Sequence, residues 1–196
     1  MRSGRWASVA ANVKEARPPL GLSAAYSQVV ADTICVEERG RIIEFTFDDL
    51  LRYAGPHSPA GVANAFKVLQ RAFALLSPDE PPPRRSVVVR TAFRGPGARD
   101  GVEAVTRAVS DGRYAVDASV ARTDLGRLRE TFVFEVRIGD RSVTLALRDG
   151  FVTEEFIDLA QTDGRTSAEE SRLDDLKAQL AQRIMTTEAP DVYELV

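Results

Sequence analysis

The stretch that decides the fold is residues 47–61, FDDLLRYAGPHSPAG, which runs directly into the apolar pattern VANAFKVLQRAFALL. A short predicted helix over 48–53 ends in a Gly-Pro-His-Ser-Pro turn, and a second helix leaves that turn. Proline fixes φ and removes a backbone donor, so the turn breaks the two helices sharply. Such a break positions side chains, which makes the turn and its histidine, His57, the first place to look for function.

Composition and charge narrow the functional classes. The chain has 196 residues, 44% hydrophobic and 28% charged, which suits one domain with appendages. A net charge of −3 argues against a nucleic-acid-binding surface. There is no run of about 18 apolar residues for a membrane span and no apolar core of a secretory signal. We therefore expect a cytoplasmic protein without a nucleic-acid or membrane partner.

Cysteine and arginine usage adds two points. The single cysteine, Cys35, excludes an intrachain disulfide and a multi-cysteine zinc site. Only three of the 26 basic residues are lysine, at positions 14, 67 and 177. This preference for arginine, with abundant alanine, is typical of a high-GC bacterial genome.

Hydrophobic periodicity predicts an α+β fold, in which an antiparallel or mixed sheet is flanked by helices. Two hairpins are expected, an N-terminal one with a polar turn at 37–40 and a stronger one over 130–147. Helices are predicted over 6–17, 48–53, 60–76, 98–109, 151–160 and from Ser167 onward. Strands are predicted over 28–36, 41–47, 86–93, 113–121, 130–138 and 141–147.

Three parts of the chain follow from this pattern. Residues 1–46 are expected to form an N-terminal helix and hairpin packed on the core. Residues 47–161 form the central domain, and residues 162–196 form a C-terminal amphipathic helix and a tail. The tail after Thr187 is expected to be loose.

The last predicted helix begins with a capping box, Ser167 with Glu170 three residues later. Its narrow apolar stripe leaves two interpretations open. The helix docks on its own domain, or it forms a dimer contact, because the spacing is close to a heptad. The stripe consists of Leu173, Leu176, Leu180 and Ile184.

From residue 47 onward, the order of elements resembles the FmdE-like domains, a family named after one component of formylmethanofuran dehydrogenase. That family carries a His-Gly-His-x-Cys-Pro-Gly turn that opens a long helix. Residues 53–60, YAGPHSPA, look like this turn with Gly55 and Pro59 retained. Residues 99–106, RDGVEAVT, are similar to a later family helix, and the hairpin over 130–147 fits the family's closing strands. The resemblance covers roughly residues 47–160.

The metal ligands of the family are largely replaced in this chain. The family's histidine and cysteine positions correspond here to Ala54, Pro56, Ser58, Pro96 or Gly97, and Ala108. A closed zinc site needs about four nitrogen or sulfur ligands, and the chain offers His57 and the distant Cys35. The resemblance therefore implies a degenerate site with no cofactor, or one metal ion or haem held through His57.

His57 and Ser58 are the candidate catalytic residues. An imidazole titrates near neutral pH and can act as a general base, whereas the alternative is a turn histidine bonded to the backbone. Ser58 needs a base and an oxyanion site to act as a nucleophile. Its alternative is the N-cap of the helix that starts at Pro59.

The second candidate is the loop over 94–100, RGPGARD, between a strand and a helix N-terminus. Free backbone N–H groups and the positive end of the helix dipole favour an anion there. Arg94 and Arg99 add charge-assisted donors, unless they pair with local acids. The spacing matches neither a Walker loop nor a dinucleotide fingerprint. The candidate ligand-binding residues are Tyr53, Asn64, Arg90, Arg94, Arg99 and Asp100.

If the family fold holds, the His57 turn and this loop approach each other and form one pocket. We expect that pocket to bind, and to transform, a small anionic metabolite. Two alternatives stay open. One is a non-catalytic binding or scaffold subunit, a homodimer formed through the last helix or a sheet edge. The other is a metal- or haem-binding protein that uses His57.

Overall fold

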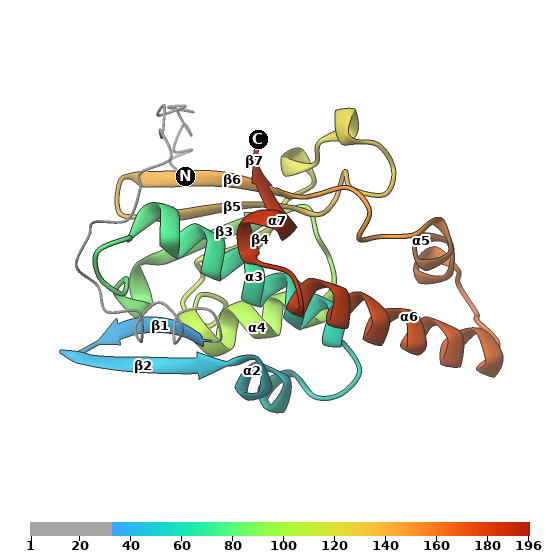
Figure 1. Ribbon diagram of the computed structural model, residues 1–196, viewed down its shortest axis with the longest axis horizontal. Helices are drawn as coiled ribbons and strands as arrows, with labels where there is room; N and C mark the ends of the chain where they lie inside the picture. The colour runs from blue at the N-terminus through green and yellow to red at the C-terminus, as the bar shows by residue number, and fades with distance from the viewer. Residues whose placement is uncertain (1–32) are drawn as a thin grey trace.

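The computed structural model describes residues 33–196, which are arranged in three layers (Figure 1). A mixed five-stranded sheet forms the first layer, helices α3, α4 and α6 form the middle, and the β1–β2 hairpin with α2 covers the other side. The fold is therefore α+β, as the periodicity predicts. The helices are α2 (Phe47–Ala54), α3 (Pro59–Leu76), α4 (Pro96–Thr106), α5 (Glu154–Gln161), α6 (Ser167–Met185) and α7 (Ala189–Val192).

The large sheet has the strand order β4-β3-β5-β6-β7. The β3–β4 pair is parallel, and the other neighbours are antiparallel. The smaller sheet is the antiparallel hairpin of β1 and β2. The strands are β1 (Thr33–Glu38), β2 (Arg41–Thr46), β3 (Val87–Thr91), β4 (Tyr114–Val116), β5 (Val133–Ile138), β6 (Arg141–Leu147) and β7 (Tyr193–Leu195).

Helix α3 is the axis of the core. It is apolar on nearly all sides, because the sheet packs on one side of it and the hairpin on the other. Ile34 and Val36 of β1, Leu180 and Ile184 of α6, and Tyr193 of β7 belong to the same buried cluster as the residues of α3. No helix in the described part of the chain is long and apolar enough to cross a membrane.

At the N-terminus, the hairpin forms with its turn at Arg39-Gly40, inside the predicted polar segment. Its first strand starts at Thr33 and continues to Glu38, two residues beyond the predicted end. The helix predicted over 6–17, and residues 28–32 of the predicted strand, lie outside the described residues.

The strand predicted over 113–121 is too long, because β4 ends at Val116. The side chain of Asp117 accepts a hydrogen bond from the N–H of Ser119 at 2.9 Å, which turns the backbone into a short 3-10 helix over Ala118–Val120. Aspartate competes with extended structure in this way when its carboxylate bonds to the backbone two residues on.

The prediction of a loose C-terminal tail is wrong. Residues after Thr187 form α7 and then β7, which pairs with β6 and extends the sheet. Val192 and Tyr193 are fully buried. These apolar side chains fill the end of the core, which supplies the burial that orders the segment.

Helix α6 begins at Ser167, as predicted, but its capping box lies one residue earlier than predicted. Thr166 is its N-cap and forms the capping box with Glu169, in place of Ser167 and Glu170. The apolar stripe of α6 is buried within the chain, where α6 packs on α3 and α5. The docking interpretation therefore describes this helix, and a homodimer stays a prediction that requires another surface.

Candidate anion-binding site

The turn before α3 and the loop before α4 meet, as the family resemblance implies. A Cβ built on Gly97 would lie 2.4 Å from the backbone oxygen of Ser58, and one built on Gly61 would lie 2.9 Å from the backbone nitrogen of Ala98. Only glycine permits so close an approach. The glycine of the predicted anion loop therefore makes a helix–helix contact, in which Gly97 and Ala98 are buried.

Ser58 and His57 occupy the turn in different ways. Ser58 stands at the N-cap position of α3, but its side chain makes no capping hydrogen bond. His57 and Tyr53 are exposed. The pKa of Asp174 on α6 is lowered by the hydrogen bond and charge of Lys177 and, to a lesser degree, by His57, which places His57 near α6. Among residues 33–196, no three His, Cys, Asp or Glu side chains gather as a metal site.

Asn64 lies apart from this turn, inside the core. It is fully buried, and its side-chain amide donates to the backbone oxygen of Ala60 at 2.7 Å. Its amide oxygen accepts a hydrogen bond from the hydroxyl of Tyr193. Both ends of the side chain are engaged within the protein, so Asn64 links α3 to the C-terminal strand.

Arg90 points away from the helices. Val87, Val89 and Thr91 of β3 are buried, so Arg90 lies on the opposite face of the sheet. There it forms ion pairs with Asp117 at 2.7 Å and with Glu135 at 2.6 Å. Arg90 therefore has a structural role on the outer face of the sheet, apart from the His57 turn.

The remaining predicted residues surround the start of α4. Arg94 is exposed, and Arg99 forms an ion pair with Asp100 at 3.4 Å. Tyr114 lies near this pair, and burial raises its pKa to about 12, with smaller opposing effects of Arg99 and Asp100. The predicted ligand residues therefore do not converge on one pocket.

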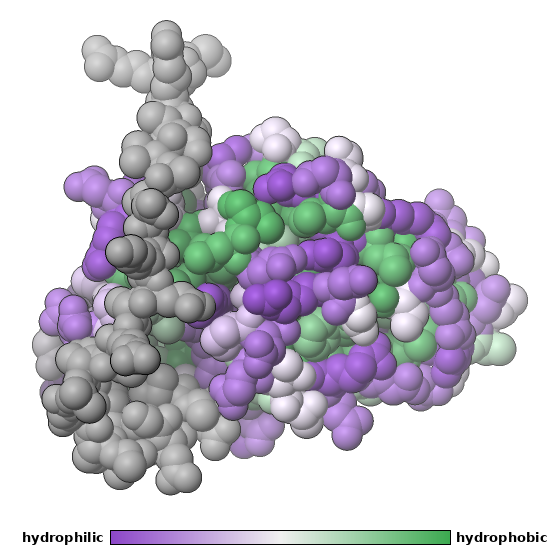
Figure 2. Space-filling view, turned by 45° about the horizontal axis from the view of Figure 1, so that its top comes forward, coloured by the Kyte–Doolittle hydropathy of each residue, from purple (hydrophilic) through white to green (hydrophobic). Residues whose placement is uncertain are grey.

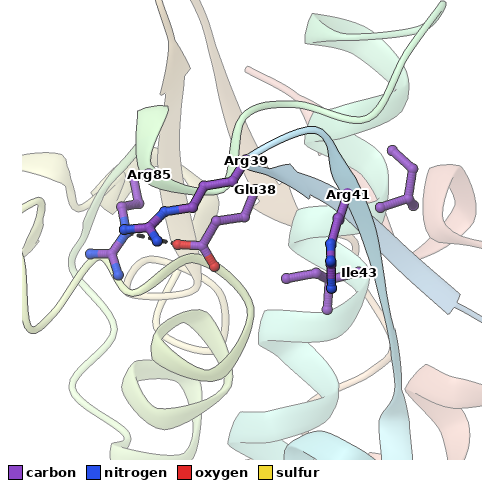
Figure 3. A pocket seen from close by; sticks show the side chains of 6 residues that line it. Glu38, Arg39, Arg41, Ile43 and Arg85 are labelled. Carbon is purple, nitrogen blue, oxygen red and sulfur yellow. Dashed lines mark hydrogen bonds and ion pairs between the residues drawn. The ribbon is translucent and has the colours of Figure 1, made fainter.

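A hollow of about 800 Å³ lies elsewhere, at the tip of the β1–β2 hairpin (Figure 3). Figure 3 shows Glu38, Arg39 and Arg85 on one side of it and Arg41 and Ile43 on the other. The hollow is lined by Glu38, Arg39, Arg41, Ile42, Ile43 and Arg85. These residues bring together the hairpin and the segment that precedes β3.

The turn of the hairpin presents two arginines. Arg39 and Gly40 both have positive φ, 56° and 76°, the signs of a type I′ turn, whose twist matches that of the flanking strands. Arg39 occupies the turn and Arg41 begins β2, and both side chains are exposed. Within residues 33–196, neither arginine forms an ion pair.

The one carboxylate of the hollow is already neutralised. Glu38 accepts hydrogen bonds from Arg85 at 2.9 Å and from Arg84 at 3.0 Å, and these bonds lower the pKa of its carboxyl group. Arg85 also pairs with Asp111 at 2.8 Å. Because Glu38 and Asp111 have partners, the charges of Arg39 and Arg41 give the hollow a positive excess.

Arg84 fixes the hairpin against α4. Its guanidinium donates to the backbone oxygens of Val105 at 2.8 Å and Ala104 at 2.7 Å, in the last turn of α4. It also lies over the ring of Phe45, 5.3 Å from the centroid, and this cation–π contact joins it to β2. The arrangement holds the hollow on rigid elements although its tip is a turn.

Sequence reasoning missed Arg39, Arg41 and Arg85, since it assigned Arg39 to a polar turn, Arg41 to the start of a strand, and Arg85 to the connection between a helix and a strand. A usable signal is present, because EERGR at 37–41 places two arginines beside two acids and RR at 84–85 adds a second pair of arginines. Only folding shows which of these arginines are paired. No family model matches the sequence, and no curated protein matches it.

Exposed apolar side chains are few and spread over several elements. Figure 2 shows polar side chains over much of the visible face, with apolar surface between them. Among the described residues, the large exposed ones are Ile42, Tyr53, Val116, Leu195 and Val196. Ile42 is 53% exposed, and of these five it is the one that lines the hollow.

Proposed function

We propose that the protein binds an anionic ligand, through its carboxylate or phosphate group, in the hollow at the hairpin tip. The observation that carries the proposal is the pair of exposed arginines, Arg39 and Arg41, which have no acidic partner in the described part of the chain. A guanidinium offers a planar fork of donors that matches both anions. Glu38 does not offset this charge, because two other arginines already bond to it.

The chemistry of the lining favours binding over catalysis. The hollow is formed by arginine, isoleucine and one glutamate, and the pKa of that glutamate is lowered by Arg85 and Arg84. A general base works best with a pKa near the working pH. A binding role therefore fits the residues better than a reaction does.

Two other ideas remain proposals of their own. The FmdE-like relationship with a degenerate metal site is supported by the order of elements and by the contact of Ser58 with Gly97. A homodimeric, cytoplasmic binding subunit agrees with the anion-binding proposal, because neither requires a catalytic group.

Titration calorimetry with inorganic phosphate and with succinate at low ionic strength tests the proposal. The double variant R39Q/R41Q should bind both anions at least about tenfold more weakly, because charge-assisted hydrogen bonds are lost. Added salt should weaken wild-type binding, since the arginines are exposed. The matched control, R94Q/R99Q, removes two exposed arginines around the start of α4 and should bind like the wild type.

Two results would overturn the proposal. The first is a wild-type protein that binds neither anion. The second is binding that survives in R39Q/R41Q and disappears in R94Q/R99Q, which would return the site to the start of α4.

A further inference from the structure

One edge of strand β2 is not paired with any strand in the described part of the chain, and we call it the free edge. Within residues 33–196 it pairs with β1 on one side and with no strand on the other, and Figure 1 shows it as the outermost strand of its layer. The outer edge of β1, in contrast, is covered. The N–H of Glu37 donates to the backbone oxygen of Pro82 at 2.9 Å, and Gln70 donates to the oxygen of Thr33.

These bonds show which backbone groups of β2 point outward. Opposite residues of an antiparallel pair either both face each other with their N–H and C=O groups or both face away. Because Glu37 donates away from β2, its opposite residue, Ile42, also faces away from β1. Glu44 and Thr46 follow with the same orientation, and the N–H of Thr46 is used by Asp49 at 2.9 Å. Ile42 and Glu44 are left with outward donors and acceptors.

The free edge starts at the arginine-lined hollow. Arg41 is the first residue of β2, and Ile42 and Ile43 also line the hollow. A strand laid along this edge would therefore find backbone partners along β2 and a positive charge at its end. Glu44 would repel a carboxylate placed opposite it, which restricts acidic groups to the end beside Arg41.

We infer that β2 accepts an extended peptide segment of a partner protein, which adds a strand to its free edge and places an acidic side chain beside Arg41. This inference rests on the proposed function, since it identifies the bearer of the anionic group. Main-chain hydrogen bonds supply affinity in this mode of recognition, and side-chain pockets supply specificity. Antiparallel addition is the more stable pairing and brings the C-terminal end of the peptide to Arg41.

A second copy of the chain fits this edge less well. A two-fold pairing of two β2 strands about Ile43 sets Arg41 opposite Phe45 and Glu44 opposite Ile42. A pairing about Ile42 sets Arg41 opposite Ile43, and a pairing about Glu44 sets two like charges opposite each other. None of these registers gives Arg41 an acidic partner, and charge complementarity therefore favours the acidic peptide.

The test uses a fluorescent peptide, Thr-Val-Lys-Val-Thr-Glu, blocked at both ends, and measures binding by fluorescence anisotropy. The glutamate lies opposite Arg41, and the lysine lies opposite Glu44. Replacing the peptide's glutamate by glutamine should weaken binding about tenfold. Methylating the nitrogen of the peptide residue opposite Ile42 should do the same, because that N–H points at β2. Methylating the residue opposite Ile43 should have little effect, because that N–H points away.

A protein variant separates strand addition from anion binding. Glu44→Pro removes an outward donor at a position that does not line the hollow, and it leaves the β1–β2 hydrogen bonds in place, since proline is tolerated on an edge strand where its nitrogen faces solvent. It should lose peptide binding about tenfold or more and still bind phosphate like the wild type. Glu44→Thr, which also lacks the carboxylate but keeps the N–H, is the matched control and should bind both.

Three outcomes would overturn the inference. Peptide binding that is indifferent to both methylation sites, or retained by Glu44→Pro, excludes strand addition while phosphate binding still supports the proposed function. A wild-type dimer in light scattering that becomes a monomer in Glu44→Pro assigns the edge to a second copy. The methylated peptides use the wild-type protein, so the test does not depend on the folding of the variant.

Discussion

The hydroxyl of Tyr193, close to the end of the chain, donates a hydrogen bond to the side-chain oxygen of Asn64 in α3. Both residues are fully buried, and the ring of Phe134 meets that of Tyr193 edge-on, with the centroids 5.9 Å apart. A buried polar group is stable only with a partner. The pair therefore fixes the C-terminal strand in one position on the helix that organises the core.

Tyr193→Phe should destabilise the protein by about 1–3 kcal/mol, because it leaves the oxygen of Asn64 buried without this donor. Urea unfolding at neutral pH measures the change. The control is Tyr53→Phe, which alters an exposed ring and should leave the free energy of unfolding unchanged. Equal losses in the two variants would contradict a specific role for the buried pair.

Gly97→Ala should destabilise the protein by about 1–3 kcal/mol through overpacking. The added Cβ would lie 2.4 Å from the backbone oxygen of Ser58, so α3 and α4 must move apart. A loss of stability would be informative, because alanine in place of glycine normally stabilises a helix by about 0.5–1 kcal/mol. Ala178→Gly on the exposed face of α6 measures that propensity in the same protein. A Gly97→Ala variant as stable as the wild type would mean that the helices are not in close contact.

Glu103→Gln should reduce stability at pH 7, and its difference from the wild type should shrink in acid. Burial tends to raise the pKa of Glu103, but hydrogen bonds from the Ser110 hydroxyl and from the N–H groups of Ser110 and Val109, with the charge of Arg107, lower it overall. A lowered pKa adds stability above the unfolded value of about 4.5, and this is lost as pH falls through the folded value.

Unfolding free energies between pH 3 and pH 7, measured for wild type and Glu103→Gln, check this dependence. Glu80→Gln, at an exposed position in the connector, serves as the control and should follow the wild type at every pH. A constant difference between Glu103→Gln and wild type across the range would argue against the ionised carboxylate.

Arg84→Lys should cost about 2 kcal/mol, although it keeps the charge. Lysine cannot reproduce the fork that bonds to the oxygens of Val105 and Ala104 while also reaching Glu38. Arg85→Lys is the control, because Arg85 is 56% exposed and its two acidic partners accept a point charge. Thermal unfolding measures the difference. Equal melting temperatures for the two variants would show that the Arg84 guanidinium does not stabilise the contact between the hairpin and α4.

Arg39→Asn should stabilise the hairpin and weaken anion binding. Arg39 has a φ of 56°, and the left-handed region costs a residue with a Cβ about 1–2 kcal/mol, less for asparagine. We expect the melting temperature to rise by a few degrees and phosphate affinity to fall. Arg39→Lys keeps both the strain and the charge, so it should resemble the wild type in both measurements. If the Arg39→Asn variant binds phosphate as tightly as the wild type, position 39 takes no part in binding.

Local sequence predicted the elements whose signals are local. The prolines and glycine around His57 predict the break between α2 and α3, and the alternation over 130–147 predicts the pair of β5 and β6. The predictions were wrong where a side-chain hydrogen bond or a contact with a distant part of the chain overrode the local preference. Asp117 ended β4, and the burial of Tyr193 against α3 ordered a segment that looks like a tail.

The candidate site shows the same division. The sequence indicates arginines and glycines near turns, but not which of them are already occupied. Gly97 packs closely against the backbone of Ser58. Arg90 forms ion pairs with Asp117 and Glu135, and Arg84 donates hydrogen bonds to the end of α4. Arg39 and Arg41 stand out only after these partners are assigned.

Periodicity and turn chemistry, acting over a few residues, by themselves determined the α+β class, the main helices and the two hairpins. Tertiary structure decided the course of the C-terminal segment, the close crossing of α3 and α4, and which positive charges remain unpaired. The reason is physical. Backbone propensity depends on neighbours in sequence, whereas burial and charge pairing depend on groups that only the folded chain brings together.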